Sequence, residues 1–103
     1  MKYYHATAYT NLASILSSGI NRGIDGCVYF TTQPNDAAKF AYCHGVIDII
    51  VFEIELTTSE NNKVFETFDH NKAFFKCRSF AIDKDIHPNR IKNIFRYNMT
   101  NGN

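Results

Sequence analysis

Apolar and polar residues alternate most regularly in the middle of the chain, between residues 46 and 56. The second half of this run, Val51-Phe52-Glu53-Ile54-Glu55-Leu56, has a period of two, which is typical of a strand with one buried and one wet face. Apolar, aromatic and β-branched residues are also frequent in four shorter runs, which predict further strands: residues 2–5, 27–31, 78–82 and 90–97.

Two segments have the spacing and the end signals of short helices. In the first, over residues 11–18, Thr10 is expected to cap the start and Gly19 to end the helix. Its apolar residues share one face that would cover the sheet: Leu12, Ile15 and Leu16. The second helix is expected to begin at residues 33–36, where a proline and an aspartate suit a first turn, and to end at Gly45.

The remaining segments are expected to connect these elements. Polar or glycine-rich connections are predicted at residues 21–26, 57–62 and 87–89. Residues 63–77 lack a clear period and are expected to form short strands or irregular structure, and the tail from Asn98 is expected to fray. The sequence therefore predicts one compact α+β domain over residues 1–103, with a mainly antiparallel sheet.

Composition limits the chain to one core and argues against several functions. Its 103 residues are 45% apolar and 15% aromatic, which allows a single domain. A formal net charge of +1 gives no sign of the broad basic face of a dedicated nucleic-acid binder. Three cysteines without a CxxC pair fit a reducing compartment. With no leader pattern and no apolar run of about 20 residues, we expect a cytoplasmic monomer that does not cross a membrane.

The candidate chemistry lies in two short motifs, Tyr4-His5-Ala6-Thr7 and the strand that contains Tyr29. His5 is expected at a strand end, and the small residues after it leave the backbone of Ala6 and Thr7 open to a planar amide or a sugar hydroxyl. Tyr29 on its strand and Phe40 on the helix that follows are placed to stack on the two sides of a flat heteroaromatic ring. On spacing alone, ordinary core aromatics and a satisfied interior histidine are the simpler interpretation.

The order of these motifs resembles that of a known family. Four segments carry the likeness: His5-Ala6-Thr7, the helix that ends at Gly19-Ile20, Gly26-Cys27-Val28-Tyr29-Phe30, and Asp36-Ala37-Ala38-Lys39-Phe40. Over roughly residues 3–43 they are similar to the first half of the H-Y-E class of ADP-ribosyltransferases, which includes the poly(ADP-ribose) polymerase catalytic domains. The chain resembles RNA 2′-phosphotransferases more loosely. The resemblance implies a split sheet with two short helices and NAD as cofactor.

The resemblance also implies a role for each matching residue. His5 would hydrogen-bond the adenine-side ribose of NAD, and the backbone of Ala6 would hold the nicotinamide carboxamide. Thr7 would lie near a ribose or a phosphate. Tyr29 would stack on the nicotinamide ring, and Phe40 falls where the family often has a second stacking tyrosine.

The second half of the chain departs from the family at its third signature residue. There the family has a glutamate that hydrogen-bonds the nicotinamide ribose and helps to stabilise a cationic transition state, whereas this chain has Ser79. A serine hydroxyl does not supply the charge of a carboxylate. Arg78 or Ser79 is expected near the reacting ribose, and Arg22 and Arg78 are expected to flank the cleft, where they would meet a pyrophosphate.

Three functions remain open after this departure. They are transfer of ADP-ribose from NAD to a protein or nucleic-acid acceptor, a catalytically silent NAD- or ADP-ribose-binding module or inhibitor, and an RNA 2′-phosphotransferase-like activity. Glu53, Glu55 and Glu66 are candidate substitute acids, although the first two are more simply explained as the wet face of a strand. No spacing predicts a metal site or a Cys–His nucleophile. Small size and an asparagine-rich tail suit a phage or mobile-element effector or toxin.

Overall fold

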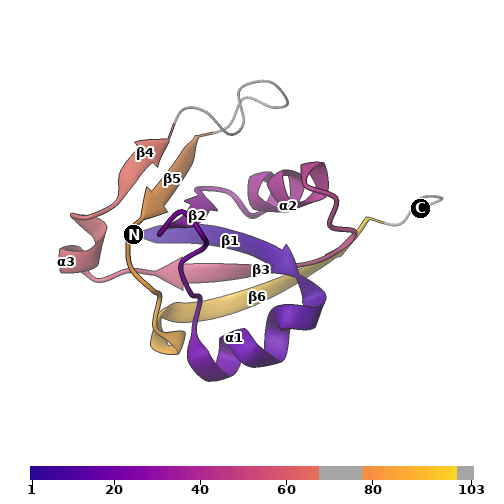
Figure 1. The fold of residues 1–103 in the computed structure, drawn as a ribbon, viewed down its shortest axis with the longest axis horizontal. Helices are drawn as coiled ribbons and strands as arrows, with labels where there is room; N and C mark the ends of the chain where they lie inside the picture. Colours follow the sequence, from indigo (N-terminus) through magenta and orange to yellow (C-terminus); the bar gives the residue numbers. More distant parts are fainter. Residues whose placement is uncertain (68–77, 100–103) are drawn as a thin grey trace.

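The computed structural model describes residues 1–67 and 78–99, and in these residues six antiparallel strands form one sheet in the order β4-β5-β2-β1-β3-β6 (Figure 1). The strands are β1 Lys2–Ala8, β2 Val28–Thr31, β3 Asp48–Glu55, β4 Phe65–Thr67, β5 Ser79–Ile82 and β6 Ile91–Asn98. The helices are α1 Leu12–Ser18, α2 Pro34–Cys43 and the one-turn α3 Thr58–Asn61, with 3-10 turns η1 Tyr9–Asn11 and η2 Pro88–Arg90. The predicted α+β class and antiparallel sheet are confirmed.

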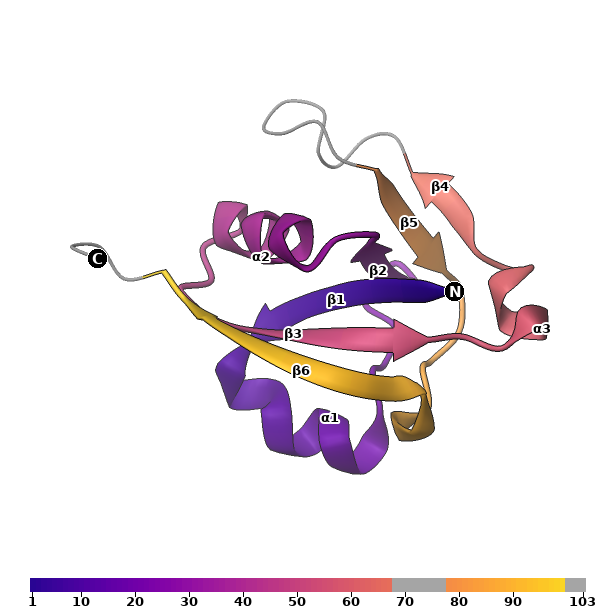
Figure 2. The ribbon, with the colours of Figure 1, turned by 180° about the vertical axis from the view of Figure 1, so that it is seen from behind.

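Helices α1 and α2 lie against opposite faces of the sheet, and each covers its own apolar cluster (Figure 2). The α1 side includes Tyr3, Ile15, Phe30, Phe52 and Phe80, and the α2 side includes Ala37, Ala38, Ala41, Ile49 and Val51. Burial of a large apolar side chain stabilises the fold by about 1.5–3 kcal/mol. Because α2 contributes only alanines to its buried core positions, its backbone lies close to the sheet.

The sheet is weakest at the junction between β1 and β2. On one edge β1 pairs with β3 along its whole length, from Lys2 to Ala8. On the other edge it pairs with β2 through one pair alone, Tyr4 with Thr31. Strands β2, β5 and β4 therefore turn away from β1, β3 and β6 (Figure 1), and the edge of β1 after Tyr4 has no β2 partner in the described part of the chain.

Two expectations for the first strand and helix were wrong. His5 is not at a strand end, because the apolar run of β3 continues to pair with β1 as far as Ala8. Thr10 does not cap α1, since it lies within η1 and the residue before the helix is Asn11, whose side chain donates to the hydroxyl of Thr7 (2.9 Å). Gly19 does end the helix, with a φ of +87° that favours glycine.

The predicted polar turn at residues 57–62 contains a helix. The Thr57 hydroxyl accepts from the backbone N–H of Glu60, and the Glu60 carboxylate accepts from the backbone N–H of Thr57. This capping box stabilises the single turn of α3. Expectations for residues 68–77 and for residues 100–103 lie outside the described residues. No helix in the described ranges has the length and apolar character needed to cross a bilayer.

Candidate functional site

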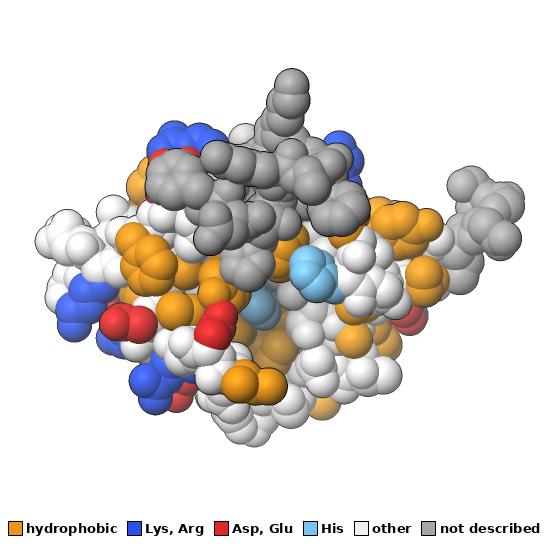
Figure 3. All heavy atoms as spheres, turned by 45° about the horizontal axis from the view of Figure 1, so that its top comes forward, with side chains coloured by type: hydrophobic (Ala, Val, Ile, Leu, Met, Phe, Trp, Pro, Cys, Tyr) orange, Lys and Arg blue, Asp and Glu red, His pale blue; other side chains and the backbone are white. Residues whose placement is uncertain are grey.

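A pocket of about 110 Å³ lies where β1 and β2 diverge, beside α2. It is lined by Tyr4, His5, Ala6, Tyr29, Phe30, Thr31, Ala37, Phe40 and Ser79. For comparison, an apolar cavity of about 150 Å³ holds a benzene molecule. Figure 3 looks onto the molecule with the top of Figure 1 turned forward, and on this face apolar and histidine side chains border a hollow. The pocket is smaller than that cavity but is partly open to solvent, so a planar ring would lie partly inside it against the aromatic lining residues.

His5 connects the two diverging strands through its ring. Its Nδ1 lies 2.7 Å from the backbone oxygen of Tyr29, and because a carbonyl oxygen only accepts hydrogen bonds, Nδ1 must carry the proton. Burial lowers the pKa of His5, although the hydrogen bond to Tyr29 opposes this shift. His5 is therefore neutral at pH 7, and its second nitrogen, Nε2, is an acceptor for a hydroxyl or an amide.

The two aromatic residues expected to stack on a ligand both line the pocket. Tyr29 lies on β2, and Phe40 lies on α2 with its ring centroid 4.5 Å from that of His44. The hydroxyl of Tyr29 donates to the carboxylate of Asp25. This hydrogen bond, together with burial and the charge of Asp25, raises the pKa of Tyr29 to about 12. The phenol is therefore protonated throughout the physiological range.

Ser79 is the polar residue that β5 contributes to the pocket. It is buried, with 5% of its surface exposed, and it pairs with Thr31 across the sheet. The Thr31 hydroxyl is already engaged, because it donates to the backbone oxygen of Gln33 (2.7 Å). No aspartate or glutamate is among the described residues that line the pocket, so Ser79 stands there without a neighbouring carboxylate.

Three residues expected at the cleft do not line this pocket. Arg22 donates from its side chain to Asp85 (3.2 Å), and Arg78 makes a two-pronged ion pair with Glu66 (3.0 and 3.1 Å). Thr7 accepts a hydrogen bond from Asn11, as described above. No pairing signal for either arginine is visible along the chain, since their partners lie 63 and 12 residues away.

The candidate substitute acids also have partners elsewhere. Glu53 lies near Lys2 (3.7 Å) and accepts from the hydroxyl of Tyr4 (3.4 Å), while Glu55 pairs with the amino terminus (2.6 Å). Glu66 is bound to Arg78, the residue before β5, and that ion pair lowers the pKa of Glu66. None of the three lines the pocket, so these residues act as surface or sheet ion pairs.

Asp25 is a residue of this site that the sequence analysis missed. It lies in the loop before β2, four residues ahead of the tyrosine it contacts. An aspartate between two glycines is a common turn signal, so the pattern pointed to a turn and not to a contact with the pocket wall. The carboxylate of Asp25 also accepts from the backbone N–H of Cys27 (3.2 Å).

The described residues give no evidence of a metal site or of an activated Cys27 thiol. In residues 1–67 and 78–99 no three His, Cys, Asp or Glu side chains gather closely enough to hold a metal ion. Burial and the charges of Asp25 and Asp83 raise the pKa of Cys27, so its thiol is not activated as a nucleophile. Comparison with known proteins adds no further guide, because no protein-family model and no curated protein matches the chain.

Proposed function

We propose that this pocket binds the nicotinamide ring of NAD, and that the protein is an ADP-ribosyltransferase-like domain acting on a protein or nucleic-acid acceptor. The observation that carries the proposal is that one pocket gathers His5, Ala6, Tyr29 and Phe40 from β1, β2 and α2. These are the residues that the sequence likeness connects with NAD. A mostly apolar pocket with a few polar groups in its wall is the usual form of a site for a flat ring.

Each wall of the pocket has a defined part in this proposal. The rings of Tyr29 and Phe40 provide the apolar surfaces for the nicotinamide, where stacking adds about 0.5–1.5 kcal/mol beyond simple burial. The neutral His5 accepts a hydrogen bond from a ribose hydroxyl through Nε2. The edge of β1 at Ala6, which has no β2 partner among the described residues, offers backbone groups to the carboxamide.

The transfer step breaks the glycosidic bond between ribose C1′ and the nicotinamide nitrogen, which takes the bonding electrons and leaves as neutral nicotinamide. The ribose carbon becomes cationic and is attacked by the acceptor. Such a cation is stabilised by a nearby negative charge, which the described pocket residues do not supply. A carboxylate side chain of the acceptor would provide both the nucleophile and that charge. The protein would then act as a mono-ADP-ribosyltransferase.

The same observation supports a second candidate, a binding module that holds NAD or ADP-ribose without transfer. In this case Ser79, in place of a carboxylate, leaves the site able to bind but unable to stabilise the cation. The two candidates differ in one product, since only the transferase releases nicotinamide.

The deciding experiment is incubation with adenine-labelled NAD and cell lysate, in which both free nicotinamide and label fixed to macromolecules are measured. Tyr29→Ala removes one wall of the pocket, and Tyr42→Ala is the matched control because Tyr42 is an exposed tyrosine of α2 that does not line it. Labelling that Tyr29→Ala abolishes and Tyr42→Ala preserves supports the transferase. Saturable NAD binding without nicotinamide release supports the binding module. Absence of NAD binding by the parent protein contradicts both.

A further inference from the structure

The turn before β2 is a rigid support at the edge of the pocket. The backbone N–H of Gly26 donates to the oxygen of Gly23 (3.0 Å), and the N–H of Gly23 donates to the oxygen of Cys27 (2.9 Å). Gly26 has a φ of +83°, a conformation that a residue with a side chain adopts only at a cost. These backbone contacts fix the position of Asp25 independently of the residues in the pocket.

The carboxylate of Asp25 connects this turn to the pocket wall with its two oxygens. Oδ1 accepts from the backbone N–H of Cys27, and Oδ2 accepts from the hydroxyl of Tyr29. The backbone of Tyr29 is held in β2 by its pairing with Ala81 on β5, and its carbonyl oxygen is bound by the ring of His5. The Tyr29 side chain is therefore fixed at both ends, at its Cα by the sheet and at its hydroxyl by Asp25.

We propose that Asp25 is a positioning residue for the ligand-binding pocket, which it serves by holding the ring of Tyr29 in the orientation that lines the cavity. This inference rests on the function proposed above, because it takes nicotinamide as the ring that stacks on Tyr29. Asp25→Ala removes the contact that holds the Tyr29 hydroxyl, so the ring is expected to take more than one orientation before the ligand binds. Ordering one such side chain weakens binding by about 3- to 10-fold.

A double-mutant cycle separates this role from a merely structural one. Asp25→Ala is expected to weaken nicotinamide and NAD binding, measured by calorimetry, by about 3- to 10-fold. Asp25→Asn keeps an oxygen that accepts from the phenol and is expected to bind within about 2-fold of the parent. In a Tyr29→Phe background the ring lacks its hydroxyl, so Asp25→Ala is expected to have a clearly smaller effect, which reflects only its other contacts, such as the one with the N–H of Cys27. Ile24→Ala, in the same turn at a fully exposed position, is the matched control.

The phenol titration gives a second measurement that does not depend on any ligand. In the parent protein Tyr29 ionises with a pKa of about 12, raised from 10.0 chiefly by its hydrogen bond to Asp25. The tyrosinate absorbance that Tyr29→Phe removes is therefore expected to move to lower pH in Asp25→Ala. An unchanged titration, or an equal loss of affinity with and without the Tyr29 hydroxyl, would overturn the role of Asp25. A parent that binds neither NAD nor nicotinamide but shows the shifted titration would instead overturn the proposed function.

Discussion

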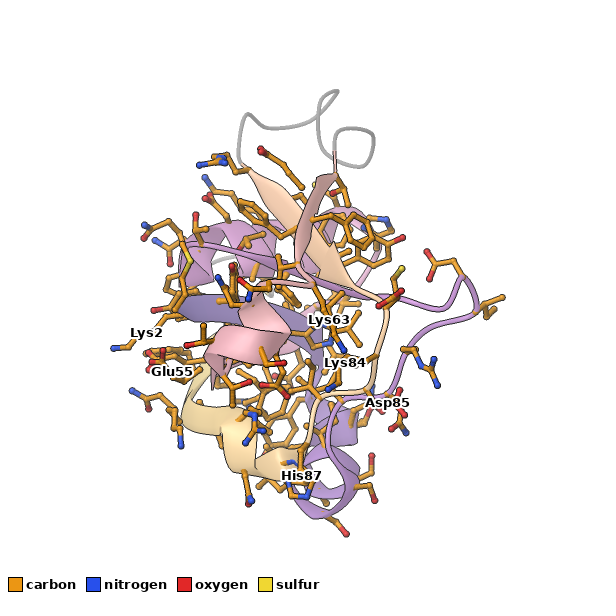
Figure 4. All side chains as sticks on the ribbon, turned by 90° about the vertical axis from the view of Figure 1, so that its left-hand side faces the viewer. Lys2, Glu55, Lys63, Lys84, Asp85 and His87 are labelled. Atoms are coloured by element: carbon orange, nitrogen blue, oxygen red, sulfur yellow. The ribbon has the colours of Figure 1, made fainter. Side chains whose placement is uncertain are left out.

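Two polar regions of this small domain differ in how their hydrogen-bonding groups are used. At the end of the sheet near α3, the buried carboxylate of Glu60 accepts from Thr57 and Arg90, with Lys84 close by. Figure 4 looks onto this end, where Lys84 and Asp85 follow β5 and the side chains of Lys2 and Glu55 project from neighbouring strands. In the pocket, by contrast, Nε2 of His5 and the hydroxyl of Ser79 have no hydrogen-bond partner among the described residues.

Whether a polar group has a hydrogen-bond partner within the protein separates structural polar groups from functional ones in such a domain. Buried polar groups normally find partners within the protein, because an unmade hydrogen bond costs about 1–3 kcal/mol. The Glu60 cluster follows that rule and therefore stabilises the fold. The pocket leaves its polar groups beside an apolar cavity, where a ligand can satisfy them. Changes in the first region are thus expected to affect stability, and changes in the second to affect binding.

The largest effect is expected from Glu60→Gln. Burial alone would raise the pKa of Glu60, but its hydrogen bonds with Arg90 and Thr57 outweigh burial and hold that pKa at about 2. Glutamine keeps an oxygen that can accept from Arg90 but removes the negative charge that pairs with it, and this loss is expected to cost about 2–3 kcal/mol. That corresponds to a fall in Tm of about 8–24 °C for a domain of this size. Thermal unfolding followed by circular dichroism measures it.

The matched control for this change is Glu55→Gln, which removes an exposed ion pair with the amino terminus. An exposed pair contributes little to stability, so this variant is expected to unfold within a few degrees of the parent. Equal losses in the two variants would mean that the Glu60 cluster is no more important to stability than a surface pair. At temperatures where Glu60→Gln is folded, its affinity for NAD is expected to equal that of the parent.

A smaller effect on binding is expected from His5→Phe, which also removes the hydrogen bond from Nδ1 to the backbone oxygen of Tyr29 and therefore lowers stability as well. The phenyl ring keeps the apolar bulk but provides no acceptor at the position of Nε2, and one hydrogen bond is worth about 0.5–1.5 kcal/mol. NAD affinity measured by calorimetry is therefore expected to fall by about 2- to 12-fold. His87→Phe is the control, because His87 is exposed and does not line the pocket. Similar losses in both variants would contradict a specific role for His5.

The sequence predicted the helices and strands that are indicated by residues within or next to the element itself. The period of two in residues 51–56 and the glycine after α1 correspond to β3 and to the observed helix end at Gly19. The likeness also selected His5, Tyr29 and Phe40, which the fold brings into one pocket. These residues lie on strands and a helix whose order along the chain is enough to make them neighbours.

The features that the sequence did not predict depend on contacts between distant residues. The end of β1 is set by pairing with β3, more than forty residues later. Arg22 was expected at the pocket but is bound by Asp85, and Arg78 is bound by Glu66. An arginine is drawn to whichever carboxylate the fold places within reach, and one sequence does not reveal that choice. Asp25 was missed for a different reason: its partner Tyr29 is only four residues away, but the path of the loop decides whether the two side chains meet.

The pH dependence of stability and of NAD binding is expected to differ between the pocket, through His5, and the Glu60 cluster. Because burial lowers the pKa of His5, the folded state binds its proton less readily than the unfolded chain. Stability and NAD affinity are therefore both expected to be constant above about pH 6.5 and to fall as the pH drops through the folded pKa. Protonation also turns Nε2 from an acceptor into a donor. The decline is expected to be absent in His5→Phe, and its persistence there would assign it to another group.

Glu60 is expected to contribute its own pH dependence in a lower and separate range. Its pKa is lowered from 4.5 to about 2, so the stability it provides is present above about pH 4.5 and is lost as the pH falls toward 2. Urea unfolding at several pH values measures both ranges. A loss of stability between pH 4.5 and 2 that is unchanged in Glu60→Gln would contradict this assignment.

The smallest effect is expected from Ser79→Ala. This variant tests whether the hydroxyl in the pocket does more than make one neutral hydrogen bond. Ser79 is buried beside Thr31, and no carboxylate accompanies it among the lining residues. A neutral hydrogen bond is worth about 0.5–1 kcal/mol, so loss of the hydroxyl is expected to weaken NAD binding or slow nicotinamide release by about 2- to 5-fold. Ser17→Ala, at an exposed position of α1, is the control. A loss of more than about 100-fold in nicotinamide release with unchanged binding would mean that Ser79 stabilises the transition state directly, and the pocket would then be catalytic without a carboxylate of its own.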